Sequence, residues 1–150
     1  MKKLSHINAE GEARMVDVSA KPVQHRVATA RGEIQLAKQT LRLVQKQKIA
    51  KGNVFATARV AGIMAAKKTW DLIPMCHPLP LTHCDVALTV PKSQDRVVIT
   101  ATVRTAAQTG VEMEALTAVS IAALTIYDMC KAVDKGMRIT GVTLLSKTKT

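Results

Sequence analysis

Four charged side chains interrupt an otherwise apolar stretch near the C-terminal end of the chain. Residues 112–133 have the pattern of a long helix and carry Glu112, Glu114, Asp128 and Lys131 among apolar neighbours. Asp128 and Lys131 are three residues apart, so their side chains can meet on one helix. The spacing alone favours an ordinary ion pair, whereas the apolar neighbours favour a partly buried, functional pair. Both interpretations stay open at this point.

The two acids Glu114 and Asp128 are too far apart to act together on one helix. They are separated by 14 positions, close to four turns, so they lie near the same face. Along the axis, however, that separation is ~21 Å at 1.5 Å per residue. Either the two acids are unrelated, or a second copy of the chain completes a site between them.

Cysteine and histidine side chains gather in and after a proline-rich loop. Cys76–His77 and His83–Cys84 offer candidate zinc ligands, but adjacent ligands are geometrically awkward and the usual two-residue gaps are absent. His77 is followed directly by Pro78. It is a candidate for carrying a proton or for donating a hydrogen bond to an anion, or else it is an ordinary loop residue.

A lysine and a glycine precede a second predicted helix. Lys51 and Gly52 combine a cation with a flexible residue, and Asn53 is a suitable N-cap. Free N–H groups at a helix start make this a reasonable phosphate cradle, although the Walker pattern is absent. Asp17, a lone acid in an apolar tetrad, is an isolated candidate that can also cap or form a salt bridge.

Positive charge is the strongest feature of the composition. The formal net charge is +11, and residues 21–51 carry many basic side chains but only one acid, Glu33. Such a field attracts the phosphates of nucleotides, nucleic acids or membranes, or it is simply a solvated face. Aromatic residues make up 2% of the chain, which leaves few platforms for stacking the bases of a single strand.

Hydrophobic periodicity predicts an α+β fold. The expected elements are a strand over 23–36, helices over 37–47 and 53–69, an irregular loop over 71–80, hairpin strands over 81–90 and 96–105, a helix over 112–133 and a strand over 137–145. The order β-αα-β-β-α-β is that of a ferredoxin-like split βαβ arrangement. We therefore expect an antiparallel sheet with helices on one face.

Length and composition predict one domain over residues 1–150. With 150 residues, of which 47% are hydrophobic, the chain is typical of a single globular domain. We expect residues 1–12 to be mobile and the C-terminal tail to be short. The uncharged runs 72–84 and 115–127 are shorter than the ~20 residues that span a bilayer. Without a signal-peptide pattern, and with only three cysteines, the chain is expected in the cytoplasm.

Three long motifs resemble those of a known family. They are MVDVSAK at 15–21, KGNVFATARVAGIMAAKKTWDLIPMCHPLPL at 51–81 and TGVEMEALTAVSIAALTIYDMCKAV at 109–133. They closely resemble cyclic pyranopterin monophosphate synthases, also called molybdenum cofactor biosynthesis protein C, and the similarity runs in order from about residue 4 to 145. The resemblance implies a ferredoxin-like subunit in a homohexamer, a trimer of dimers with active sites at the dimer interface.

The resemblance also implies a reaction in molybdopterin biosynthesis. The substrate is (8S)-3′,8-cyclo-7,8-dihydroguanosine 5′-triphosphate, which a radical SAM GTP cyclase makes. A lyase reaction converts this substrate to cyclic pyranopterin monophosphate and releases pyrophosphate, by acid/base chemistry on a lysine-bound triphosphate. The resemblance implies no tightly bound cofactor and no metal ligands, with Mg²⁺ as an optional companion of the triphosphate. Nucleic-acid and membrane partners are not expected.

Individual roles follow from the matching motif positions. Asp128 in YDMCK matches the active-site residue of the family, and Lys51 and Lys131 match its essential lysines. The positions that match substrate contacts, or that are otherwise associated with the site, are Met75, Cys76, His77, Met113, Glu114, Asp17 and Glu112. Two features depart from the family pattern: Asn53 stands where Asp is common, and the Gly-rich GGKSG tail is absent after residue 147.

Two other classes of function fit part of the sequence. A basic nucleic-acid-binding protein without chemistry would explain the charge, but the scarcity of aromatic residues and the paired acids speak against it. A purely structural hexameric scaffold would leave Asp128 and Lys131 replaceable.

Overall fold

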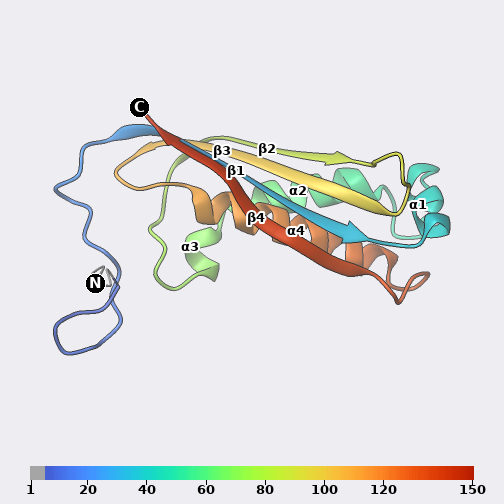
Figure 1. The fold of residues 1–150 in the computed structure, drawn as a ribbon, viewed down its shortest axis with the longest axis horizontal. Helices are drawn as coiled ribbons and strands as arrows, with labels where there is room; N and C mark the ends of the chain where they lie inside the picture. The colour runs from blue at the N-terminus through green and yellow to red at the C-terminus, as the bar shows by residue number, and fades with distance from the viewer. Residues whose placement is uncertain (1–5) are drawn as a thin grey trace.

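The computed structural model describes residues 6–150, which form one sheet and four helices (Figure 1). In chain order the elements are β1 (Gln24–Gln35), α1 (Lys38–Gln45), α2 (Val54–Lys67), α3 (Thr69–Leu72), β2 (Leu81–Thr89), β3 (Arg96–Ala107), α4 (Glu112–Cys130) and β4 (Arg138–Lys149).

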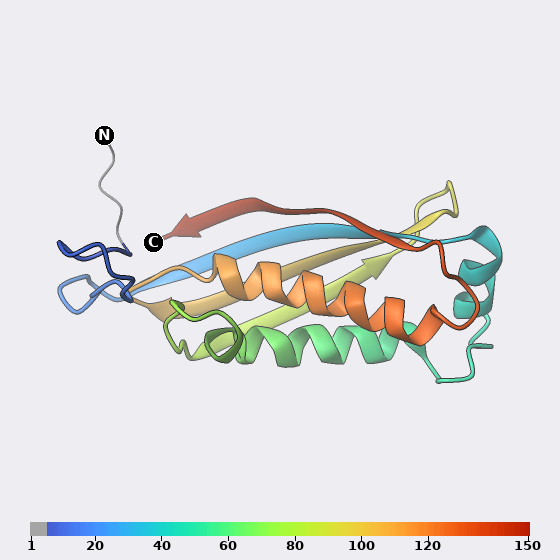
Figure 2. The same cartoon turned by 90° about the horizontal axis from the view of Figure 1, so that it is seen from below.

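All neighbouring strands of the sheet are antiparallel, in the order β2-β3-β1-β4. The two long helices, α2 and α4, run side by side along one face of the sheet (Figure 2). The arrangement confirms the predicted α+β, ferredoxin-like fold with an antiparallel sheet and helices on one face.

The core lies between the sheet and the two long helices, and small side chains dominate it. Every second residue of β1 faces the helices, so Ala28, Ala30 and Ile34 are buried. On α4 the buried face is rich in alanine. Small side chains let the helices approach closely, and Gly62 of α2 lies where an added Cβ would stand 2.9 Å from the carbonyl oxygen of Ala118.

Helix α4 is a core helix with a strongly apolar composition. It is long and apolar enough to span a membrane, but 56% of its most apolar window is buried inside the fold. The charged groups of α4 are confined to its two ends, with Glu112 and Glu114 in the first turn and Asp128 in the last.

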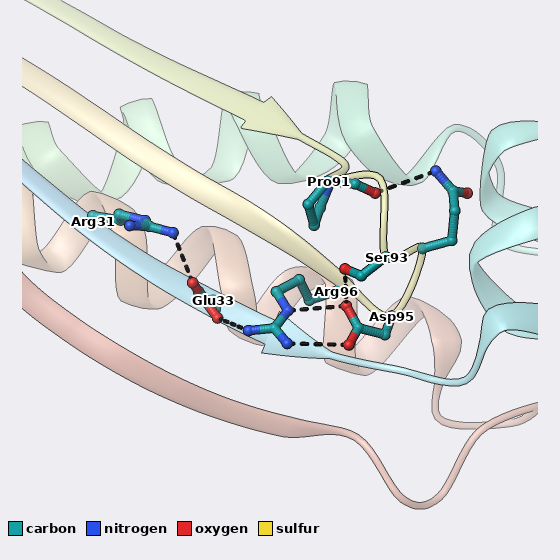
Figure 3. Close-up of polar contacts among 7 residues, drawn as sticks. Arg31, Glu33, Pro91, Ser93, Asp95 and Arg96 are labelled. Atoms are coloured by element: carbon teal, nitrogen blue, oxygen red, sulfur yellow. Dashed lines mark hydrogen bonds and ion pairs between the residues drawn. The ribbon is translucent and has the colours of Figure 1, made fainter.

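The open face of the sheet carries a chain of ion pairs (Figure 3). Glu33 accepts hydrogen bonds from Arg31 at 2.8 Å and from Arg96 at 2.9 Å, and Arg96 also pairs with Asp95 at 3.0 Å. Ser93 closes the chain by donating to the Asp95 carboxylate at 2.5 Å. The single acid of the basic stretch therefore neutralises two arginines in a structural role.

The structure corrects three predicted element boundaries. Residues 71–72, predicted to be loop, belong to α3, where the Thr69 hydroxyl donates back to the carbonyls of Ala65 and Ala66 and joins the two helices. Helix α4 ends at Cys130, before the predicted 133. Strand β4 continues to Lys149 because β1 offers partners along its whole length, as far as the pair Arg26 and Lys149.

Residues 6–22 precede the sheet without forming a named strand or helix. An isolated bridge between Ile7 and Ala13 closes a loop at the start of this segment. The prediction of a mobile segment covers residues 1–12, of which 1–5 lie outside the described residues, and it stays a prediction.

The close approach of α2 and α4 generates a prediction about Gly62. Gly62→Ala is expected to lower the free energy of unfolding by about 1–3 kcal/mol, because the new methyl group collides with the backbone of α4. Urea denaturation measures the change. Ala56→Ser, on the exposed side of the same helix, should stay within about 0.5 kcal/mol of wild type. Equal stability of Gly62→Ala and wild type would contradict the packing described here.

Candidate functional site

A pocket of about 390 Å³, here called the N-terminal pocket, lies at the N-terminal end of α4. Its walls come from four separate parts of the chain: His6, residues 16–21 before β1, the loop 75–79 after α3, and residues 109–114 at the start of α4. The predicted site residues that line it are Met75, Cys76, His77, Glu112, Met113 and Glu114. The fold thus gathers most of the predicted substrate-contacting residues in one place.

Glu114 is the buried acid of the N-terminal pocket. It lies in the first turn of α4 and is only 4% exposed. Burial raises the pKa of its carboxyl to about 7, and the nearby carboxylate of Glu112 also acts to raise this pKa. A carboxyl group that titrates near neutral pH can both accept and donate a proton there.

His77 holds its ring in place with a hydrogen bond to the backbone. Its Nε2 donates to the carbonyl oxygen of Val16 at 2.7 Å. Because a carbonyl can only accept, this bond places the hydrogen of a neutral ring on Nε2. The neighbouring Cys76 is half-buried, and burial together with the charge of Glu114 raises the pKa of its thiol. Within residues 6–150, no three His, Cys, Asp or Glu side chains gather as they would around a metal ion.

Glu112 lies between the N-terminal pocket and a second cavity. The second cavity, of about 290 Å³, is lined by the basic side chains of Arg26, Lys147 and Lys149. Lys147 donates to the Glu112 carboxylate at 2.8 Å. Burial alone would raise the pKa of Glu112, but the hydrogen bond from Lys147 and the charges around it hold that pKa below its usual value. Gly110 and Glu112 line both cavities.

A group of three charges, here called the C-terminal cluster, lies at the other end of α4. Lys51 donates to Oδ2 of Asp128 at 2.7 Å, and Lys131 donates to Oδ1 at 2.7 Å. The hydrogen bonds from Lys131 and Lys51 lower the pKa of Asp128 to about 2, and Asp128 in turn raises the pKa of Lys131. The carboxylate is therefore ionised at neutral pH and shared by two cations.

The elements around the C-terminal cluster explain how Lys51 reaches α4. Asn53 caps α2 by accepting from the N–H of Ala56 at 3.0 Å, as predicted from the sequence. Gly52 has a φ of 102°, a left-handed conformation that suits glycine. The chain therefore turns just before α2, and the Lys51 ammonium also donates to the main-chain carbonyl of Asp128 at 3.0 Å. A cation at the C-terminal end of a helix interacts favourably with its dipole.

The structure decides between the two interpretations of the Asp128–Lys131 pair in favour of the ordinary ion pair. Their side chains are 56% and 57% exposed, because the last turn of α4 buries Ile126 and Met129 and turns Asp128 outward. In a single chain they form an exposed ion pair. The apolar neighbours in the sequence belong to the buried face of the helix and do not surround the pair.

The predicted site residues therefore form two groups separated by the length of α4. Glu114 and Asp128 are ~21 Å apart along the helix axis, as expected from the sequence. Asp17 joins neither group: it is exposed, and its Oδ1 accepts from the N–H of Ser19 at 2.9 Å and from its hydroxyl at 2.6 Å. Its neighbours Val16 and Val18 line the N-terminal pocket instead.

Four basic residues beside the pockets were not predicted as site residues. Lys21 lines the N-terminal pocket, and Arg26, Lys147 and Lys149 line the second cavity. Lys21 lies in the motif MVDVSAK, which is a signal that could have found it. Arg26 and Lys147 come together through the pairing of β1 with β4, which the sequence pattern does not indicate.

Comparison with known proteins decides the family. The model of the MoaC family matches residues 15–150. The chain belongs to the MoaC family. Curated relatives named cyclic pyranopterin monophosphate synthase include one from Cereibacter sphaeroides, 58% identical over 98% of this chain and 92% of the relative. Another, from Thermomicrobium roseum, is 56% identical over 98% of the chain and 89% of the relative. A third, from Rhodospirillum rubrum, is 58% identical over 97% of the chain and 87% of the relative.

The family match confirms the resemblance seen in the three sequence motifs. It also confirms the assignment of this MoaC chain to the enzymes of molybdenum cofactor biosynthesis. The roles of individual residues stay predictions, and two of them can be tested directly.

The C-terminal cluster predicts that two of the lysines are needed for catalysis. Lys51→Ala and Lys131→Ala are expected to lower kcat by roughly 10²–10³, the cost of removing a donor that stabilises transition-state charge. Both side chains are about half exposed, so the fold should survive, as circular dichroism can check. The exposed Lys46 and Lys48 serve as controls and should tolerate alanine. Equal losses of kcat in all four variants would show that the overall positive charge of the protein, and not these two lysines, supports catalysis.

The buried carboxyl of Glu114 predicts a pH dependence of stability. Its pKa is near 7 in the folded chain and near 4.5 when unfolded. The contribution of this carboxyl to the free energy of unfolding is therefore complete below about pH 4.5. That contribution is lost as the pH rises toward 7. Glu114→Gln removes the titration. The free energy of unfolding of wild type, relative to Glu114→Gln, should therefore fall by on the order of 2–3 kcal/mol between pH 4 and 8. Urea denaturation at each pH measures it, and a pH-independent difference would contradict the burial of an ionisable group.

Proposed function

We propose that this protein converts (8S)-3′,8-cyclo-7,8-dihydroguanosine 5′-triphosphate to cyclic pyranopterin monophosphate and releases pyrophosphate. One observation supports this most: the residues to which the family motifs assign roles are scattered along the sequence, yet all of them except Asp17 form two compact groups in the fold. One group contains a carboxyl that titrates near neutral pH, and the other contains two lysines on one carboxylate.

The triphosphate of the substrate needs several cations, and they are available beside the N-terminal pocket. Lys21 lines that pocket, and Arg26, Lys147 and Lys149 line the adjoining cavity. Arginine and lysine bind phosphate oxygens through charge-assisted hydrogen bonds. We therefore place the phosphates near the junction of the two cavities, where β1 and β4 supply the cations.

Ring rearrangement and internal attack on phosphate need groups that give and take protons. Glu114, in the wall of the N-terminal pocket, offers a carboxyl that titrates near pH 7. In the C-terminal cluster, Asp128 holds Lys51 and Lys131 together. Their ammonium groups can stabilise the negative charge that develops on phosphate in the transition state. We expect Met75, Cys76 and Met113 to contact the substrate as part of the pocket wall.

The two groups must meet for all of these residues to act on one substrate. We propose that a second copy of the chain packs with its α4 antiparallel, so that the C-terminal cluster of one chain approaches the N-terminal pocket of the other. A two-fold interface of this kind makes two equivalent sites. Three such dimers form the expected homohexamer. The exposed state of Asp128 and Lys131 in a single chain agrees with this arrangement, because the partner would cover them.

The expected cellular setting follows from the substrate. A radical SAM enzyme that cyclises GTP must supply it, and we place the protein in the cytoplasm as one domain over residues 1–150. We expect no tightly held cofactor, and Mg²⁺ can accompany the triphosphate as part of the substrate. Nucleic acid and membrane are not expected partners.

Product analysis with the cyclised guanosine triphosphate tests the proposed function. Wild type should release one pyrophosphate for each cyclic pyranopterin monophosphate formed, and Lys131→Ala should form neither at a comparable rate. Polynucleotide binding that weakens steeply with salt, without any pyrophosphate, would support the nucleic-acid-binding alternative instead.

Mixing of two inactive variants tests the shared site. Glu114→Ala and Asp128→Ala are each expected to be inactive, but a mixed dimer places both lesions in one site and leaves the other intact. Random exchange into pairs with independent sites should restore roughly a quarter of the wild-type activity. No recovery, with subunit exchange demonstrated by isotope labelling and mass spectrometry, would show that each site is built within one chain.

A further inference from the structure

Residues 13–21, here called the strap, form an irregular segment along the N-terminal pocket. The strap is exposed except for Val16 and Val18, which are half-buried and line the pocket. Its last residue, Lys21, also lines the pocket. The strap therefore supplies two apolar contacts and one cation to the proposed substrate site, although it belongs to no strand or helix of the sheet domain.

Few hydrogen bonds hold the strap in place. Within residues 6–150, the bonds that join residues 6–22 to the rest of the fold are those of His77 to the carbonyl of Val16 and of Gln108 to the carbonyl of Ser19. The bond from His77 is short, 2.7 Å, whereas that from Gln108 is long, 3.4 Å. His77 is thus the main polar tether of the strap.

Asp17 shapes the strap from within. Its Oδ1 accepts from both the N–H and the hydroxyl of Ser19, and the N–H of Lys21 donates to the carbonyl of Val18 at 2.9 Å. These bonds fold residues 17–21 into a compact turn. The turn directs Asp17 to solvent while its neighbours Val16 and Val18 face the pocket.

We propose that His77 and Asp17 are positioning residues that hold the strap as one wall of the substrate pocket. His77 fixes the strap to the loop 75–79 through the Val16 carbonyl, and Asp17 sets the turn that delivers Lys21. This role deepens the proposed function and rests on it only for the identity of the substrate. It accounts for the presence of Asp17 in a site motif although its carboxylate does not line the pocket.

Amide hydrogen exchange of the full-length protein without substrate tests the proposal. The reporters are the amides of Ser19 and Lys21, which are hydrogen-bonded only while the turn is formed. His77→Ala should speed their exchange severalfold, while His77→Gln, which keeps a donor close to the position of Nε2, should leave it near wild type. Asp17→Ala should also speed exchange, and Asp17→Asn, which keeps the acceptor oxygen, should not.

Two controls make the result specific. The exposed His83 lies on β2 away from the pocket, so His83→Ala should leave strap exchange unchanged. Amides of α2 should exchange at the wild-type rate in every variant, which excludes global unfolding. Unchanged strap exchange in His77→Ala, or equally fast exchange in His77→Ala and His77→Gln, would overturn the proposal.

Steady-state kinetics separates positioning from direct participation. If His77 acts through the strap, His77→Ala raises KM for the cyclised guanosine triphosphate and His77→Gln restores it. His77→Gln could also leave the strap amides protected from exchange and still show a high KM or a lost kcat. That result would show that the ring itself acts on the substrate, and it would overturn the positioning role. A wild-type protein with no activity on this substrate would refute the proposed function, while the exchange result would still decide what holds the strap.

Discussion

The length of α4 is the constraint on which the proposed site depends. A helix is rigid on the scale of a small molecule, and its axis separates Glu114 from Asp128 by ~21 Å. Apolar burial along the middle of α4 fixes this helix against the sheet, so the two ends cannot approach each other within one chain. Any site that uses both the N-terminal pocket and the C-terminal cluster must therefore be completed by another copy of the chain.

The electrostatics of the two ends differ in a way that suits a divided site. At the N-terminal end, burial keeps the Glu114 carboxyl partly protonated near pH 7. At the C-terminal end, two lysines keep Asp128 ionised. The first environment favours proton transfer, and the second favours binding of negative charge. Tight packing around Gly62 and the ion pairs around Glu33 keep the framework between these environments fixed.

The sequence predicts what local patterns determine, and it is less informative where distant segments meet. The Asn53 cap, the hairpin and α4 follow from turn chemistry and periodicity, and the structure confirms them. The contact of Lys51 with Asp128 joins residues 77 positions apart, and no local pattern indicates it. The sequence left the burial of Asp128 open, and the structure exposes its side chain because the apolar neighbours point into the core. Asp17 was assigned to the site by its motif alone, whereas the structure turns it to solvent and brings Val16 and Val18 to the pocket.

Photo-crosslinking tests the divided site most directly. A benzophenone side chain replaces Met113, which is 38% exposed at the N-terminal pocket, in a mixture of ¹⁴N- and ¹⁵N-labelled chains. Its reach is far shorter than the ~21 Å between the two ends of α4. The account predicts cross-links of mixed isotopic label between position 113 and peptides that contain Lys51 or Asp128. Cross-links of mixed label that never include these peptides, in a protein shown to be oligomeric, would contradict it.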